Sequence, residues 1–238
     1  MVIPRPAQPG PAIDVRALSK LHGPTAALMD VTFSIEPGDM VAVLGAPGTG
    51  KTTLLKLLAG HVTPTGGRIR VCGIDVRTAR VALTEKIGYV SQHMGDRGNM
   101  SPRDLLEFGG RARQIPPRML NRRIEDVVAI CELDGEFHAP CERLDADGRG
   151  RVALARALLH EPSVLLLDGL LAEPDEAGML GTLRILRRLR GATTLLVTGP
   201  ARMLSVLPAN RALLLDGGRL TFDGRATDMS PDAPDDPR

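Results

Sequence analysis

The order of apolar and polar positions along the chain predicts two kinds of β-strand. Residues 164–167 (VLLL) and 194–198 (TLLVT) are apolar without alternation, which is typical of strands covered on both faces in a parallel sheet. The earlier runs are separated by turns such as Glu36-Pro37-Gly38-Asp39 and predict antiparallel pairing. The predicted strands are residues 13–18, 31–35, 39–44, 69–71, 87–91, 164–167, 194–198, 212–215 and 219–222.

Helical patterns separate many of these strands. Ser101 followed by Pro102 and Asp104 is typical of a helix start, because serine caps the first amides and proline suits the first helical position. The predicted helices are residues 51–59, 102 to about 115, 117 to about 133, and near 149 to 160. We therefore expect an α/β fold with a mostly parallel sheet, an antiparallel N-terminal β subdomain and a helical insert over about residues 96–160. Residues 1–12 are expected to form a flexible lead, residues 13–228 the folded domain and residues 229–238 a polar tail.

Composition narrows the possible partners. Of 238 residues, 43% are hydrophobic and 24% are charged, and the net charge is only +2, so binding to a nucleic-acid backbone is not expected. Aromatic residues make up 2% and tryptophan is absent, which disfavours base stacking on single strands. Cys72, Cys131 and Cys141 have no metal-binding spacing and are read as ordinary thiols of a reducing compartment. Without a leader or a membrane span, we expect a cytoplasmic protein that meets a membrane only through a partner.

A glycine-rich segment fits the pattern GxxxxGK[ST] and stands between a predicted strand and a predicted helix, as this motif requires. Its glycines let successive backbone N–H groups face a phosphate, and the helix N-terminus adds partial positive charge. Lys51 can reach the β- and γ-phosphates, and the Thr52 hydroxyl can bind Mg²⁺. The alternative is an ordinary glycine-rich turn. The predicted nucleotide-binding residues are Gly45, Ala46, Pro47, Gly48, Thr49, Gly50, Lys51, Thr52 and Thr53.

Two further residues are candidates for a Mg²⁺ site beside Thr52. Asp168 ends the buried run 164–167, where its carboxylate can hold Mg²⁺ directly or through water; the alternative is an aspartate that caps the strand end. Gln92 follows the run 87–91 and can reach the metal or a water. Such a P-loop NTPase core also suits an AAA-type motor or a small nucleoside-phosphate kinase, but the helical insert between Lys51 and Asp168 disfavours both.

Three stretches carry a resemblance to the ATP-binding subunit of ABC transporters, which covers about residues 13–227. They are ALMDVTFSIEPGDMVAVLGAPGTGKTTLLKLLAGHVTPTGGRIRVCGID, IGYVSQ and RVALARALLHEPSVLLLD. The chain looks most similar to subunits that serve ABC-2-type exporters. The resemblance implies ATP and Mg²⁺ as cofactors, a second nucleotide-binding domain in a head-to-tail homo- or heterodimer, and a transmembrane permease subunit as partner. It also implies a peripheral location on the cytoplasmic face of the membrane.

The resemblance implies a role for several individual residues. Gly45–Thr53 matches the phosphate loop, and Asp168 matches the metal-site aspartate. Gln92 matches the glutamine that senses Mg²⁺ and water. His22 lies where the family stacks an aromatic ring on adenine, although it can equally be an ordinary surface histidine. Asp175 matches the aspartate of a loop at the dimer contact.

Two departures from the family concern groups that act on the terminal phosphate. The family's catalytic Glu follows the metal-site Asp, but this chain has Gly169, and losing a positioned general base typically costs about 10²–10⁴ in rate. The family's switch His follows the later core strand, but here Gly199 takes its place. Glu173 is a further acid that can in principle approach the attacking water. No catalytic group of the family is therefore intact, apart from the metal- and water-sensing Gln92.

The third departure is the segment LDADG at residues 144–148, where the family has LSGGQ. That signature holds the γ-phosphate of ATP bound to the opposite subunit. If Asp145 and Asp147 take those places, like charges about 4 Å apart repel by about 4 kcal/mol at an effective dielectric of about 20, more than the roughly 1.5–3 kcal/mol of a hydrogen bond to a charged group. The alternatives are that one aspartate merely caps the following helix, or that the register shifts to Gly148 and Gly150.

Together these residues predict a subunit that binds Mg-ATP but hydrolyses it slowly. Two other functions remain open at this point: a transport ATPase whose activity is rescued by its partner, and a non-enzymatic ATP-sensing module that binds another protein.

Overall fold

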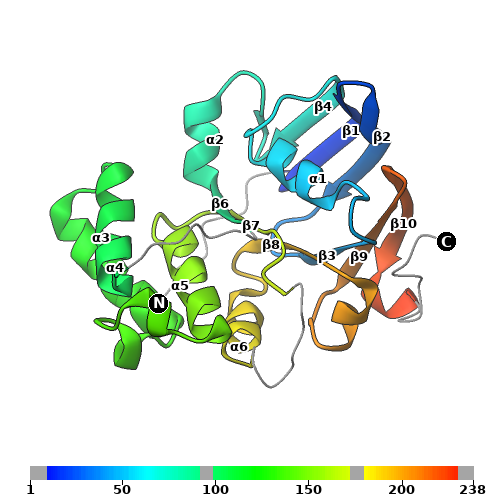
Figure 1. Cartoon of the computed structure of the whole chain (residues 1–238). Coiled ribbons are helices and arrows are strands. Elements are labelled where there is room, and N and C mark those ends of the chain that lie inside the picture. Colours follow the sequence, from blue (N-terminus) through cyan, green and yellow to red (C-terminus); the bar gives the residue numbers. More distant parts are fainter. Residues whose placement is uncertain (1–9, 92–98, 172–179, 230–238) are drawn as a thin grey trace.

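The computed structural model describes residues 10–91, 99–171 and 180–229, which form two sheets and the helices packed against them (Figure 1). The smaller sheet is antiparallel and has the strand order β2-β1-β4-β5. Its strands are β1 (Ile13–His22), β2 (Thr25–Ile35), β4 (Gly66–Val71) and β5 (Ile74–Asp75). The antiparallel N-terminal β subdomain expected from the sequence is confirmed.

Strand β2 begins earlier than predicted, at Thr25 instead of residue 31. Pairing between β1 and β2 is irregular, with register shifts after Val15 and Leu18. Ala17 in β1 and Asp30 in β2 have positive φ angles of 49° and 53°, as expected where a strand is bulged. These irregularities interrupt the alternation of apolar and polar positions, which is why the sequence pattern misses the first half of β2.

The larger sheet has the strand order β10-β9-β3-β8-β7-β6, and every pair except β9–β10 is parallel. Its strands are β3 (Met40–Leu44), β6 (Ile87–Val90), β7 (Val164–Leu167), β8 (Thr194–Gly199), β9 (Arg211–Asp216) and β10 (Arg219–Arg225). Strands β3, β7 and β8 are buried along their whole length. The mostly parallel sheet predicted from unbroken apolar runs is confirmed.

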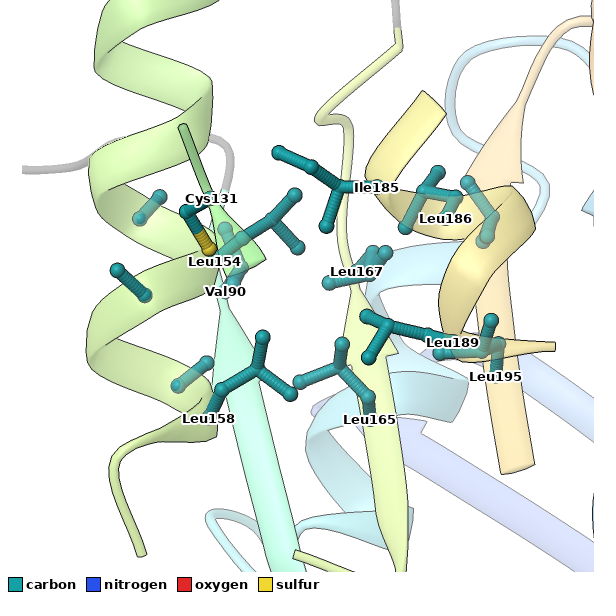
Figure 2. Packing of buried hydrophobic residues seen from close by; sticks show 14 of the residues in the cluster. Val90, Cys131, Leu154, Leu158, Leu165, Leu167, Ile185, Leu186, Leu189 and Leu195 are labelled. Atoms are coloured by element: carbon teal, nitrogen blue, oxygen red, sulfur yellow. The ribbon is translucent and has the colours of Figure 1, made fainter. Parts of the chain in front are cut away.

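Alternate residues of the central strands enter two separate hydrophobic cores. Leu165 and Leu167 of β7 pack with helices α5 (Ala146–Leu158) and α6 (Leu180–Leu189), as Figure 2 shows. Val164 and Leu166 face the core that includes α1 (Lys51–Leu58) and the antiparallel sheet. Both faces of β7 are therefore covered. This double coverage explains why its sequence is continuously apolar.

Helices cover both faces of the larger sheet. They are α1 (Lys51–Leu58), α2 (Arg80–Lys86), α3 (Pro102–Ala112), α4 (Pro117–Ile130), α5 (Ala146–Leu158) and α6 (Leu180–Leu189). Short 3₁₀ turns occur at Asp134–Glu136, Cys141–Arg143, Ala201–Ser205 and Ala226–Asp228. Figure 1 shows α3, α4 and α5 grouped on the side away from the antiparallel sheet. No helix within the described residues is long and apolar enough to cross a membrane.

One helix start predicted from the sequence is wrong. Helix α5 begins at Ala146, not near Arg149, because Asp145 is its N-cap and accepts a hydrogen bond from the Gly148 amide at 2.6 Å. An aspartate is among the strongest N-cap residues, and it starts the helix before its apolar stripe begins. The boundaries of the flexible lead and the polar tail stay predictions, since residues 1–9 and 230–238 lie outside the described residues.

Candidate nucleotide-binding site

The loop between β3 and α1 has the backbone conformation that its glycines predict. The φ angles of Gly45, Gly48 and Gly50 are 143°, 85° and 102°. A Cβ atom at Gly45 would lie 2.2 Å from the Leu215 carbonyl oxygen, and one at Gly50 would lie 2.5 Å from the Ala27 oxygen. Only glycine fits at these two positions, because side chains there meet rigid backbone.

A cavity of about 520 Å³ opens on this loop, within the range of about 300–1,000 Å³ that is usual for ligand pockets. The loop, the start of α1 and the C-terminal ends of β7 and β8 line it together. The lining residues are Ala27, Gly45, Ala46, Pro47, Gly48, Gly50, Lys51, Thr52, Thr53, Asp168, Gly169, Thr198, Gly199, Pro200 and Arg202. Of the predicted phosphate-loop residues, Thr49 alone is not among them; it is buried, and its hydroxyl donates to the Ala46 carbonyl at 2.9 Å.

The N-terminus of α1 points into the cavity without a side-chain cap. Gly50 occupies the N-cap position, and no acidic residue stands in the first turn. The Lys51 ammonium lies over the loop, donating to the carbonyl oxygens of Gly45 and Ala46, each at 2.6 Å. Uncapped amides, the helix dipole and an ammonium group thus converge on one concave surface, which is suited to bind an anion.

Asp168 is nearly inaccessible, with 3% of its surface exposed, and it accepts hydrogen bonds from three hydroxyl groups. Thr52 Oγ1 donates to its Oδ1 at 2.9 Å, Thr198 Oγ1 donates to the same oxygen at 3.1 Å, and the Tyr89 hydroxyl donates to Oδ2 at 3.0 Å. The site therefore brings Thr52 and Asp168 together, as predicted. Their hydroxyl and carboxylate oxygens are hard donors of the kind that Mg²⁺ prefers.

Tyr89 stays protonated in this environment. Burial raises the pKa of its hydroxyl, and the neighbouring Asp168 carboxylate raises that pKa further. Its ring and the ring of His61 form a T-shaped pair, with ring centroids 4.9 Å apart. The Tyr89 hydroxyl is thus a permanent donor to Asp168, and it orients the carboxylate toward Thr52.

The two glycines that follow β7 and end β8, Gly169 and Gly199, stand where a side chain would be strained or would clash. Gly169 has a φ of 69°, a left-handed conformation that costs other residues roughly 1–2 kcal/mol, and its amide donates to Thr198 Oγ1 at 2.8 Å. A Cβ atom at Gly199 would lie 2.6 Å from the sulfur of Met203, which is fully buried. The backbone at Gly169 and the packing at Gly199 are thus adapted to glycine.

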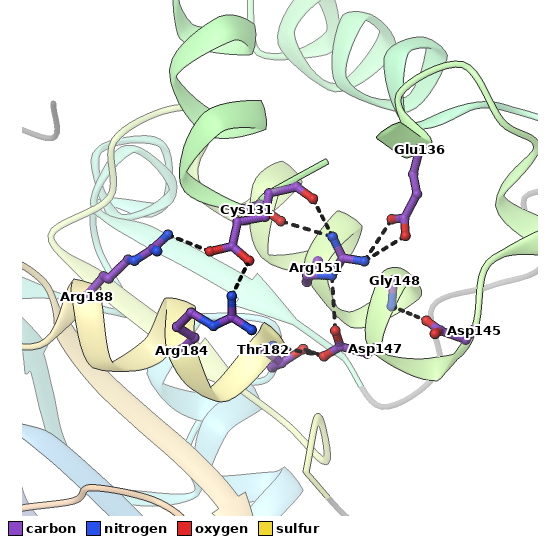
Figure 3. Close-up of polar contacts among 10 residues, drawn as sticks. Cys131, Glu136, Asp145, Asp147, Gly148, Arg151, Thr182, Arg184 and Arg188 are labelled. Carbon is purple, nitrogen blue, oxygen red and sulfur yellow. Dashed lines mark hydrogen bonds and ion pairs between the residues drawn. The ribbon is translucent and has the colours of Figure 1, made fainter. Parts of the chain in front are cut away.

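The polar side chains of the segment at residues 144–150 bind within the chain (Figure 3). Asp145 caps α5, and the Arg149 guanidinium donates back to the Leu144 carbonyl. Asp147 Oδ1 accepts from the amide and hydroxyl of Thr182 at 2.9 and 2.8 Å, and its Oδ2 accepts from Arg151 Nε at 3.1 Å. The capping alternative is therefore the correct one for Asp145. The repulsion expected from Asp147 is not supported, because that carboxylate points inward and is paired.

Arg151 extends this contact into a network. Its guanidinium pairs with Glu136 at 2.8 Å and donates to the carbonyl oxygen of Glu132. The Glu132 side chain in turn pairs with Arg184 and Arg188 of α6, at 3.1 and 2.8 Å. The start of α5 is therefore bound both to the end of α4 and to α6 (Figure 3).

A family model described as "ABC transporter" matches residues 28–172. The chain belongs to the ABC transporter family.

Curated relatives of this ABC transporter chain are import proteins. The sulfate/thiosulfate import ATP-binding protein CysA of Nocardia farcinica is 37% identical over 91% of this chain and 66% of its own length. The sn-glycerol-3-phosphate import ATP-binding protein UgpC 1 of Rhizobium etli is 31% identical over 92% of this chain and 63% of its own length. The chain thus spans about two thirds of the length of these relatives. Their names correct the expected likeness to ABC-2-type exporters. The motifs that carried this expectation lie almost entirely within residues 28–172, which match the family model, and the description of that model names no direction of transport.

Solved structures show the same fold. The cbiO1 protein of Clostridium perfringens, described as part of the ABC transporter complex cbiONQ, has a TM-score of 0.81 and 24% identity, covering 92% of this chain and 90% of its own. The cassette MJ0796, solved as a dimer bound to ADP and Pi, has a TM-score of 0.77 and 20% identity, covering 90% of this chain and 98% of its own.

Of the remaining predicted site residues, only His22 is among the described residues. Gln92, Glu173 and Asp175 lie outside the described residues. His22 is exposed at the end of β1 and does not line the cavity, so its contact with adenine stays a prediction. Sequence reasoning missed Tyr89, whose only signal was its place three residues before Gln92, and Arg202, which no motif marked.

Proposed function

We propose that this chain is an ATP-binding subunit of an ABC importer that binds Mg-ATP and hydrolyses it slowly. The supporting observation is the contrast within one cavity: the phosphate-binding loop is complete, while the two positions at the ends of β7 and β8 are glycines adapted to having no side chain. The names of the curated relatives favour import of a small oxyanion over export. A permease subunit and a second nucleotide-binding domain are the proposed partners, and they would hold the chain at the cytoplasmic face of the membrane.

The described residues fit a magnesium nucleotide. Gly45 and Gly50 allow the loop to pass close to the backbone of β9 and β2, where a Cβ would clash, and the uncapped amides of α1 face the cavity. Thr52 and Asp168 would hold Mg²⁺ through their oxygens, with the Tyr89 hydroxyl keeping the carboxylate in place. Bound Mg²⁺ would neutralise charge on the β- and γ-phosphates. Lys51 would exchange its contacts with loop carbonyls for phosphate oxygens.

Slow hydrolysis follows from the residues beside Asp168. Among the described residues that line the cavity, Asp168 is the sole acid, and no histidine is present. Asp168 already accepts three hydrogen bonds, so it is poorly placed to take a proton from water. If the described residues hold all the groups that act on the attacking water, the lack of a positioned base among them costs about 10²–10⁴ in rate.

The start of α5 favours the same conclusion. In a head-to-tail dimer, this helix N-terminus would face the terminal phosphate held by the partner. Here the Asp145 carboxylate already accepts from the Gly148 amide, and Gly148 and Gly150 are both buried. An anion already capping the helix competes with phosphate for those amides. The chain is therefore a poor contributor to a partner's site.

The decisive experiment compares nucleotide binding with phosphate release for the purified chain and for two variants, Gly169→Glu and Gly169→Gln. Both variants carry the same left-handed strain and nearly the same volume, but only glutamate can act as a base. We expect ATP binding by all three proteins and more phosphate release from Gly169→Glu than from Gly169→Gln. Release by the unmodified chain at an ordinary rate, about 10 per second, would reject slow hydrolysis. A chain that does not bind ATP would reject the whole proposal.

A further inference from the structure

Arg202 supplies the net positive charge of the cavity lining. Among the described residues that line it, Lys51, Asp168 and Arg202 are the charged ones. The ammonium of Lys51 and the carboxylate of Asp168 cancel. A triphosphate remains anionic even with Mg²⁺ bound, so Arg202 decides whether the cavity has net positive charge.

Arg202 lies at the metal end of the cavity. It lines the cavity beside Gly199 and Pro200, in the turn that follows β8, and Thr198 at the end of that strand contacts Asp168 at 3.1 Å. Asp168 and Thr52 would hold the Mg²⁺ that neutralises phosphate charge, so a cation in the turn after β8 would stand on the side of the cavity where the terminal phosphate is expected. The phosphate loop begins beside the same strand, since Leu44 of β3 pairs with Gly199 of β8.

The turn that carries Arg202 is anchored, and its side chain is available. Its neighbours Ala201 and Met203 are buried, with 1% and 0% of their surfaces exposed, whereas Arg202 is exposed. The Met203 amide donates to Pro200 at 3.0 Å, and the Ser205 hydroxyl donates to the Arg202 carbonyl at 2.9 Å. Within the described residues no carboxylate pairs with Arg202, in contrast to the paired Arg151 and Arg211.

We propose that Arg202 binds the terminal phosphate of the nucleotide and makes the site selective for the triphosphate over the diphosphate. The inference rests on the proposed function, because it requires the cavity to bind ATP. A guanidinium group suits this role, since its planar set of donors can bind two phosphate oxygens at once. With Gly199 offering no side chain and Gly169 no charge, this wall of the cavity has no other cation among the described residues.

The test is calorimetric titration with Mg²⁺ and either ADP or the hydrolysis-resistant analogue AMP-PNP. Four proteins are compared: the unmodified chain, Arg202→Gln, Arg202→Lys and Arg187→Gln. Arg187 is an exposed arginine of α6 that does not line the cavity, so its variant controls for the general loss of one positive charge. Unfolding temperatures check that each variant is folded.

We expect Arg202→Gln to weaken AMP-PNP binding about tenfold or more, since a hydrogen bond to a charged group is lost, while ADP affinity changes less than about twofold. Arg202→Lys should lose less, because it keeps the charge, and Arg187→Gln should match the unmodified chain. Unchanged AMP-PNP affinity in Arg202→Gln, or an equal loss for both nucleotides, would overturn this role for Arg202 and leave ATP binding intact. Failure of the unmodified chain to bind either nucleotide would overturn the proposed function as well.

Discussion

Replacing Asp147 with alanine tests whether the acidic segment before α5 serves the fold or faces a phosphate. In the structure this carboxylate accepts three hydrogen bonds, two of them from Thr182, which is completely buried. Alanine leaves the Thr182 amide and hydroxyl without this acceptor. Arg151 keeps its pair with Glu136 and its backbone contacts, so most of the loss arises at Thr182.

The size of the effect follows from the two buried donors. Each buried polar group left without a partner costs about 1–3 kcal/mol, so Asp147→Ala should lower the free energy of unfolding by about 3–5 kcal/mol. In a chain of this length, 1 kcal/mol corresponds to about 2–4 °C in melting temperature. The expected fall is therefore roughly 6–20 °C. Urea unfolding followed by circular dichroism measures the free energy, and calorimetry measures the melting temperature.

Two controls isolate the contact. Asp145→Asn should change stability by less than about 0.5 kcal/mol, because asparagine caps helices as well as aspartate. Thr182→Val removes the hydroxyl partner, and its double-mutant cycle with Asp147→Ala should give a coupling of about 1 kcal/mol or more. A loss below about 1 kcal/mol for Asp147→Ala, together with tighter nucleotide-driven dimerisation, would refute the reasoning. It would show that Asp147 repels a phosphate instead of binding Thr182.

Three further outcomes are expected. Tyr89→Phe removes a donor to Asp168, so the Mg²⁺ concentration needed for half-maximal ATP binding should rise about tenfold. Nucleotide binding without Mg²⁺ should be unchanged, and an unaltered Mg²⁺ requirement would contradict the role of Tyr89 in positioning Asp168. Gly199→Ala should cost about 1–3 kcal/mol in urea unfolding, because its Cβ overpacks against Met203; a neutral effect would mean that Met203 moves freely. Partial desolvation, with a smaller effect of Lys56 and Arg80, lowers the pKa of His61, although the residue is exposed overall. The unfolded chain therefore binds the proton more readily, and stability should fall slightly as the pH drops below about 6.5. The fall should be shallower in His61→Asn, and an identical pH profile in that variant would show that His61 is not its cause.

Local pattern was sufficient for much of the fold and for one half of the site. The unbroken apolar runs of β7 and β8 predicted buried parallel strands, because side chains on both faces must be apolar when both faces are covered. The phosphate loop was equally predictable, since the spacing of its glycines, lysine and threonine between a strand and a helix is a local motif, although the contacts that exclude a Cβ at Gly45 and Gly50 come from distant strands. The pairing of Thr52 with Asp168 could be inferred because the ends of parallel strands meet at one edge of the sheet.

Contacts between segments distant in sequence were beyond the reach of such patterns. Whether Asp147 repels a phosphate or binds the protein depends on Thr182, which lies on another helix. Whether Gly199 could carry a side chain depends on how Met203 packs against it. Arg202 lines the cavity because the turn that carries it is held beside the end of β8. The residue type determines which bonds a side chain can make. The packing of the whole chain determines which partner it contacts, because a close-packed interior leaves one arrangement for each buried group.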